Sequence, residues 1–394
     1  MTSNPRKRAR SSSPGPSSHS YCVRDTEYYD EEGDCIIRVE KVLFKTHRVF
    51  LTRKSEVLAD MFKLPQGDLP AEGTADENAI VLPGDKASQF RAFLRYTLAS
   101  PLETQVDQVP IKAAVSVANL GHFANKYMMT GLVEWAVAVI QRLCQNPTPG
   151  PNGQFPAEFL RSALLLAKDA PIAAELWDLI PEVWKRHLKF IFSRLQYRDA
   201  LDAAELVGHR AFLVDLYYLI LSHRPHSWGM TALPPQQFTH RGLAPIHLQR
   251  LFAGTWSLTI LWQQLANHRP KDQLPSNLMC SGHSKCVADW NKRWRDCTRS
   301  SDVDSLNPAD IIGRITKAEK LFRTKYPTEL SVSSSCVYKM MGLDNPFERV
   351  RKEVKDSLAQ RFFDTIFPFV VLSHHLTIFI LGTEGSALYA PLTS

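Results

Sequence analysis

A segment rich in proline and glycine divides this sequence into two stretches with different patterns. Asn146–Gly153 holds three prolines and two glycines in eight residues, a composition that favours neither helix nor strand. Before this segment, short runs with strand spacing alternate with helical ones; after it, apolar residues recur at helical spacing. We therefore predict a mixed α+β domain in residues 28–145, a linker at 146–154 and a mainly helical region over 155–394.

The first 27 residues are predicted to form a disordered basic tail. Residues 1–20 are rich in Ser and Pro and contain no acid, so they bury too little apolar surface to offset the cost of ordering. A compact basic run within them is interpreted either as a nuclear-import signal or as a solvated tail; it holds Arg6, Lys7, Arg8 and Arg10. Most of the net charge of +7 lies there, so the folded part is nearly balanced and nucleic acid is not an expected partner.

The cysteines and the start of the chain indicate a reducing compartment. Seven scattered cysteines and no apolar leader argue against a disulfide framework and against secretion, so we expect a nuclear or cytoplasmic protein. The apolar stretch Phe362–Leu381 is interrupted by Asp364, His374 and His375, which are costly in lipid. We predict that this stretch is buried or covered by a partner, and that the protein does not enter a membrane.

Within residues 28–145, the spacing of apolar residues predicts a small sheet packed against several helices. Ser55 is a good N-cap for a following helix, and the polar segment 64–78 is predicted to be a surface loop. Strands are predicted at 34–40, 42–45 and 80–82, and helices at 56–62, at 87–98 and within 111–144.

These elements carry motifs that resemble the opening of a BTB/POZ domain. The stretch DCIIRVEKVLFKTHRVFLTRKSEVLADMF has the family's residue types in the family's order, at Asp34, Val39, Phe44, His47, Arg48, Leu51, Ser55, Met61 and Phe62. The strand at Ile80–Leu82, the helix around Phe90–Tyr96 and the run HFANKYMMTGLVEWAVAVI are similar to later parts of the domain. The resemblance is greatest to the BTB proteins that are numerous in fungi.

The resemblance implies a non-catalytic protein that self-associates as a homodimer or binds a protein partner. Asp34 and Arg48 match a charged pair that many BTB domains place in their dimer groove, so both are candidate partner contacts, whereas His47 is expected to be structural. The segment Asp25–Asp34 is short for a strand-exchanged dimer, and Pro70-Ala71-Glu72 is a poor match to the cullin-binding element. A substrate adaptor for a cullin-type ubiquitin ligase is one alternative function.

The sequence contains no glycine-rich phosphate loop, HExxH, GxSxG or CxxC motif. We therefore predict no enzyme activity, no catalytic residues and no bound cofactor. One group has residue types that bind zinc, and its weak candidate ligands are Cys280, His283, Cys286 and Cys297, with Cys336 as an alternative fourth. Buried core cysteines are the favoured interpretation.

The same region is basic and aromatic, and a nuclear transcription regulator that touches DNA there is the second alternative function. Trp290 and Trp294 are expected to be core residues beneath a solvated basic face. Elsewhere in the C-terminal region, Pro171 and Pro181 are predicted to start or interrupt helices, and Asn345-Pro346 is predicted to start one.

Overall fold

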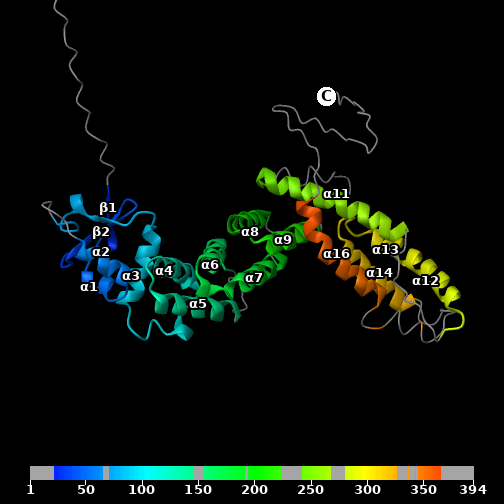
Figure 1. Cartoon of the computed structure of the whole chain (residues 1–394), viewed down its shortest axis with the longest axis horizontal. Helices are drawn as coiled ribbons and strands as arrows, with labels where there is room; N and C mark the ends of the chain where they lie inside the picture. Colours follow the sequence, from blue (N-terminus) through cyan, green and yellow to red (C-terminus); the bar gives the residue numbers. More distant parts are fainter. Residues whose placement is uncertain are drawn as a thin grey trace, which may run out of the picture. The chain divides into compact units, whose positions relative to one another are not determined.

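The computed structural model describes residues 22–64, 71–145, 155–190, 194–222, 242–267, 280–325, 336, 342 and 345–364. The chain divides into two compact units, Met1–Val183 and Trp184–Ser394, whose elements are drawn in Figure 1. The predicted linker, residues 146–154, lies outside the described residues, so its role as a domain boundary stays a prediction.

The first unit contains a four-stranded sheet in the order β1-β3-β2-β4. The central strands β2 and β3 form an antiparallel hairpin in which Ile37 lies opposite Phe44, while β1 runs parallel to β3 and β4 parallel to β2. The strands cover Val23–Tyr29 (β1), Cys35–Val39 (β2), Val42–Thr46 (β3) and Ile80–Val81 (β4). The three predicted strands are thus β2, β3 and β4.

Strand β1 corrects the prediction of a disordered tail through residue 27, because it begins at Val23. The Asp25 carboxylate fixes this strand. It accepts hydrogen bonds from the backbone N–H groups of Glu27 and Tyr28, at 3.0 and 2.9 Å, and from the Arg91 guanidinium at 2.5 Å. Asp25 is the one buried residue of the strand. An edge strand anchored by a carboxylate lacks the apolar alternation by which strands are predicted.

Five helices complete the region in which the BTB/POZ resemblance was found. They are α1 (Arg48–Thr52), α2 (Glu56–Lys63), α3 (Ala87–Leu98), α4 (Ala114–Lys126) and α5 (Thr130–Gln145), with short 3-10 turns at Asp76–Asn78, Val106–Gln108 and Ile111–Ala113. The Ser55 hydroxyl accepts the backbone N–H of Leu58 and donates to the Tyr127 carbonyl at 2.7 Å. The predicted N-cap is therefore confirmed, and it also ties α2 to the end of α4.

A cluster of phenylalanine rings joins the sheet to these helices. Phe44 of β3 lies edge-on to Phe90 of α3, with ring centroids 4.9 Å apart. Phe90 and Phe93 in turn contact Phe123 of α4, at 5.4 and 5.0 Å. All four rings are fully buried, so the hairpin and the helices share one hydrophobic core.

The first unit continues beyond residue 145. Helix α6 (Ala157–Asp169) packs on α4, and a 3-10 turn at Pro171–Ala173 leads to α7 (Leu176–Phe190). Gly121 allows the close approach, since a Cβ there would lie 2.6 Å from Cδ2 of Leu166. Pro181 lies inside α7, contrary to the prediction that it would start or interrupt a helix.

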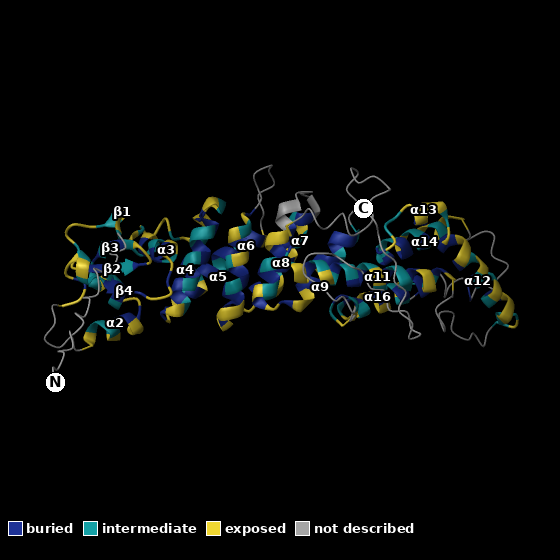
Figure 2. Ribbon diagram, turned by 90° about the horizontal axis from the view of Figure 1, so that it is seen from above, coloured by how far each residue is buried: buried dark blue, intermediate teal, exposed yellow. Residues whose placement is uncertain are grey.

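In the described residues of the second unit, all regular secondary structure is helical. Beyond the end of α7, its helices are α8 (Arg194–Val207), α9 (Arg210–Ser222), α11 (Pro245–Asn267), α12 (His283–Thr298), α13 (Ser301–Asp304), α14 (Ile311–Lys325) and α16 (Pro346–Phe363). The Asn345 side chain accepts the backbone N–H groups of Phe347 and Glu348, which confirms the predicted N-cap. Figure 2 shows buried residues along α11, α14 and α16.

Helix α16 packs against α9, α11 and α14. An aromatic cluster of Trp290, Trp294, Phe322 and Phe347 joins α12, α14 and α16, with Trp294 and Phe347 stacked at 5.0 Å. Both tryptophans are fully buried, as predicted. No described helix combines the length and the apolar character that a membrane crossing requires, and most of Phe362–Leu381 lies outside the described residues.

Removing the charge of Asp25 is expected to free β1 in a pH-dependent way. Burial pushes the pKa of Asp25 upward, but the hydrogen bonds from Arg91, Glu27 and Tyr28 outweigh it and hold the pKa below its usual 3.8. The stabilisation is therefore present above about pH 4 and is lost as the pH falls through the folded pKa. Asp25→Asn should lower the protection of the Glu27 and Tyr28 amides by on the order of 2 kcal/mol at pH 7, measured by hydrogen exchange.

The difference in amide protection between Asp25→Asn and the wild type should shrink below about pH 4, because the wild-type carboxylate becomes protonated there and also loses its charge. Asp60→Asn is a suitable control, because Asp60 pairs only with Lys63 on the surface of α2 among the described residues. A β1 segment equally protected in Asp25→Asn and in the wild type at pH 7 would contradict the anchoring role.

Gly254 is expected to be essential for the crossing of α11 and α16. A Cβ at this position would overlap Cε1 and Cδ1 of the Phe362 ring. Gly254→Ala should destabilise the second unit by about 1–3 kcal/mol through overpacking, despite the gain of about 1 kcal/mol in helix propensity. Thermal unfolding of the full chain measures the loss. Adding Phe362→Ala should relieve the clash, so the two substitutions should be non-additive, and Gly131→Ala, which meets nothing within 4 Å, should be harmless.

Candidate protein-interaction site

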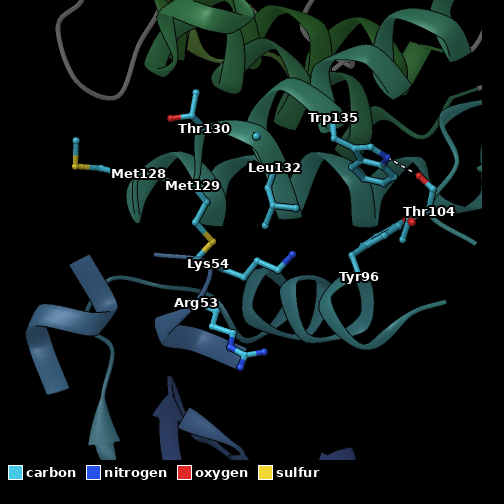
Figure 3. Close-up of a pocket in the computed structure, with 10 residues that line it drawn as sticks. Arg53, Lys54, Tyr96, Thr104, Met128, Met129, Thr130, Leu132 and Trp135 are labelled. Atoms are coloured by element: carbon cyan, nitrogen blue, oxygen red, sulfur yellow. Dashed lines mark hydrogen bonds between the residues drawn. The ribbon is translucent and has the colours of Figure 1, made fainter. Parts of the chain in front are cut away.

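A groove of about 450 Å³ lies on the first unit, between the α1–α2 connection, the end of α3 and the α4–α5 connection. Figure 3 shows the aromatic side chains at one side of the groove and the basic side chains on another. The residues that line the groove include Arg53, Lys54, Tyr96, Thr104, Met128 and Trp135.

The aromatic wall is held rigid by contacts among its own residues. The Tyr96 and Trp135 rings lie 4.8 Å apart, and the Trp135 indole N–H donates to the Thr104 carbonyl at 2.6 Å. Burial raises the pKa of Tyr96, so its hydroxyl stays protonated at neutral pH. Fixed aromatic rings lose little conformational entropy when a partner binds, which is why they suit a binding surface.

Met128 lines the end of the groove that lies away from Tyr96 and Trp135, and 76% of its surface is exposed. Its backbone φ is +55°, the left-handed conformation that commonly ends a helix and that favours glycine. Its N–H donates to the Asn125 carbonyl, and the N–H of Met129 donates to that of Ala124 at 2.8 Å. The fold thus holds a large apolar side chain in solvent at a strained position, a combination that is frequent at functional sites.

The charges around the groove have one sign. Arg53 and Lys54 are both exposed, and no carboxylate belongs to the described residues that line the groove. The site therefore combines an apolar and aromatic wall with two cations. Such a surface is suited to a segment that carries an apolar side chain next to acidic groups.

The two candidate partner contacts, Asp34 and Arg48, are hydrogen-bonded to each other, but through the backbone N–H of Arg48 and not through its guanidinium. The Arg48 N–H donates to Oδ1 of Asp34 at 2.7 Å, so the carboxylate caps the start of α1. The Arg48 guanidinium lies 5.3 Å from the centre of the Phe62 ring. His47 lies beside Phe50, with Nε2 3.6 Å from Oδ2 of Asp30. A partner-contact role for Asp34 and Arg48 stays a prediction.

The remaining candidates lie elsewhere. The basic run of Arg6, Lys7, Arg8 and Arg10 lies outside the described residues. In the second unit, ligand atoms of Cys280, His283 and Cys336 all lie within 4.8 Å of one another, and Sγ of Cys286 is 3.6 Å from that of Cys280.

Cys297 does not join this group. It lies eleven residues after Cys286 on α12, and three helical turns place it roughly 16 Å away. Burial raises the pKa of the Cys297 thiol to about 12, as expected for a cysteine in the hydrophobic core. The structure thus gathers the alternative fourth residue, Cys336, in place of Cys297.

Residues 27–141 match the family model of the BTB/POZ domain. This part of the chain is a BTB/POZ domain. The resemblance found in the sequence is confirmed for the domain, whereas a particular likeness to fungal proteins stays a prediction. BTB/POZ domains mediate partner binding and dimerisation and are generally non-catalytic. No curated protein matches the chain.

The groove itself was not predicted from the sequence. Its lining comes from three segments that are far apart in the chain, so no local pattern contains it. The one available signal was the pair Met128-Met129 between two predicted helices, where a turn would more often have glycine or a polar residue.

Replacing Met128 by glycine is expected to stabilise the BTB/POZ domain while removing an apolar side chain from the groove. Glycine adopts positive φ without steric cost, and relief of the strain should be worth about 1 kcal/mol, seen as a higher midpoint of thermal unfolding. Met129→Gly is the matched control, because Met129 is buried and its loss should destabilise the domain. A Met128→Gly variant less stable than the wild type would contradict this reading of the turn.

Proposed function

We propose that this protein acts through protein–protein interaction, and that its BTB/POZ domain binds a partner protein in the groove around Met128. The family match supports an interaction role in general. The observation that carries the specific proposal is an exposed apolar side chain, held in a strained conformation at one end of a groove that has a rigid aromatic wall at its other end and two cations in its lining.

The partner is expected to insert an apolar side chain flanked by acidic residues. A volume of about 450 Å³ is within the range of binding pockets, roughly 300–1,000 Å³, and can accept a few side chains. Arg53 and Lys54 would steer the acidic groups toward the groove. Tyr96, Met128 and Trp135 would supply most of the apolar contact area, because aromatic residues and methionine are enriched at interface centres.

Binding of a different protein is favoured over strand exchange between two copies. Strand β1 already pairs with β3 of the same chain, and its Asp25 is bonded to Arg91 of α3. Exchanging β1 would require breaking these contacts. Self-association is therefore an outcome that the experiment must distinguish, and the helical region after residue 155 is available as a second surface.

Affinity purification of the full-length protein with mass spectrometry tests this proposal. Partners captured by the wild type should be lost from Met128→Glu and from Lys54→Glu, which place negative charge where acidic groups are expected. Leu102→Glu is the matched control, because Leu102 is 73% exposed and lies outside the groove lining. Binding of each captured protein is then measured directly with purified components.

We expect direct binding at least tenfold weaker for Met128→Glu than for Leu102→Glu. If a cullin is captured and binds Met128→Glu more weakly than Leu102→Glu, the protein would act as an adaptor for a cullin-type ubiquitin ligase through the same groove. Equal binding by both variants would overturn the proposal. So would light scattering that shows a dimer as the sole interaction and finds that dimer unchanged by the groove substitutions.

A further inference from the structure

Three cysteines and a histidine meet at the start of α12 in the second unit. Cys280 and His283 lie on either side of the helix start, and Cys286 follows one turn later, on the same face as His283. The fourth residue, Cys336, belongs to the connection between α14 and α16. Two segments about fifty residues apart in sequence therefore bring their sulfur and nitrogen atoms together.

Two of the distances between these atoms match the edges of a tetrahedral zinc site. Zn–S bonds of about 2.3 Å and Zn–N bonds of about 2.0–2.1 Å give edges of about 3.8 Å between two sulfurs and about 3.6 Å between sulfur and nitrogen. Sγ of Cys280 is 3.6 Å from Sγ of Cys286, and Sγ of Cys336 is 3.5 Å from Nδ1 of His283. Two opposite edges of a tetrahedron thus have the required length. The ligand atoms of Cys280, His283 and Cys336 lie within 4.8 Å of one another, whereas Sγ of Cys286 lies outside this group of three and adjoins it at Cys280, so its side chain would turn toward the ion on binding.

We propose that Cys280, His283, Cys286 and Cys336 bind one zinc ion. Three thiolates and an imidazole form a soft ligand set that suits zinc. Four protein ligands leave no open position for substrate, so the site is structural. The three thiolates leave a charge of about −1 on the zinc complex, which the positive end of the α12 dipole stabilises.

The burial of the four residues separates this site from a set of ordinary core cysteines. Cys286 and Cys336 are buried, whereas Cys280 and His283 are only half-buried. Hydrophobic burial does not explain why two half-exposed polar groups converge on two buried thiols. Cys297, on the same helix, shows the alternative: it is buried and lies three helical turns beyond Cys286.

The position of the site suggests what the zinc ion stabilises. Trp290 follows Cys286 by one helical turn and contacts Phe322 of α14 and Phe347 of α16. A zinc ion bound one turn earlier would fix the α14–α16 connection to α12 next to this aromatic cluster. Because a preformed site is rare in an unfolded chain, the binding energy would add to the stability of the fold.

Metal analysis of the full-length protein, purified without a histidine tag, tests the proposal. We expect one zinc ion per chain, with three sulfur ligands and one nitrogen ligand by X-ray absorption spectroscopy. Cys280→Ser should lose the zinc, and Cys280→His, which keeps a ligand, should retain it. Cys297→Ala is the matched control and should also retain it. Zinc removal by a chelator should reduce the hydrogen-exchange protection of α12.

Three results would overturn the proposal: protein produced with ample zinc that contains none, a disulfide between Cys280 and Cys286 in the freshly purified protein, or a zinc ion with fewer than three sulfur ligands. Cys336→Ser is a further variant, whose buried position carries a risk of misfolding. The ligand count in the wild type does not depend on any variant, so it decides the question even if Cys336→Ser fails to fold. The groove lies in the other unit, so loss of partner binding and loss of zinc are separate outcomes.

Discussion

The Phe44 side chain of the central strand β3 packs edge-on against Phe90 of α3, and Phe90 in turn contacts Phe123 of α4. A two-stranded hairpin is marginally stable by itself, so the sheet depends on this contact with the helices. The same core fixes α3 relative to α4. The positions of Tyr96 at the end of α3 and of Met128 after α4 follow from it, and with them the shape of the groove.

The BTB/POZ domain therefore combines a rigid interior with a strained exposed turn. The Ser55 hydroxyl ties the start of α2 to the Tyr127 carbonyl, and the Tyr127 hydroxyl donates to the buried Asp85 at 2.6 Å. These two bonds fix both the backbone carbonyl and the side chain of Tyr127, the residue that precedes Met128. A positive φ at a methionine persists when its surroundings over-determine it, and here they do so beside the proposed binding groove.

The second unit depends on α16 in a similar way. Gly254 of α11 has no side chain where the Phe362 ring approaches, and Phe347 at the other end of α16 stacks on Trp294. Helix α16 thereby links α11 with the aromatic cluster on α12 and α14. The proposed zinc site would join the start of α12 to the segment between α14 and α16, next to the aromatic cluster.

The sequence by itself determined the features that depend on neighbouring residues. The hairpin of β2 and β3, the caps at Ser55 and Asn345 and the helices α2, α3 and α16 follow from local spacing and from side chains that bond within one turn. The order of residues from Asp34 to Phe62 was enough to indicate the BTB/POZ domain.

Only the tertiary structure decided the features that join distant residues. Strand β1 is held by Arg91 rather than by apolar alternation, and the groove is assembled from three segments that are distant in the chain. The choice between Cys297 and Cys336 as the fourth candidate ligand could not be made from sequence spacing. Three turns of α12 separate Cys286 from Cys297, whereas the tertiary structure brings Cys336 close to Cys280 and His283. Contacts of this kind depend on the path of the chain in space, which the sequence specifies only through the packing of the whole unit.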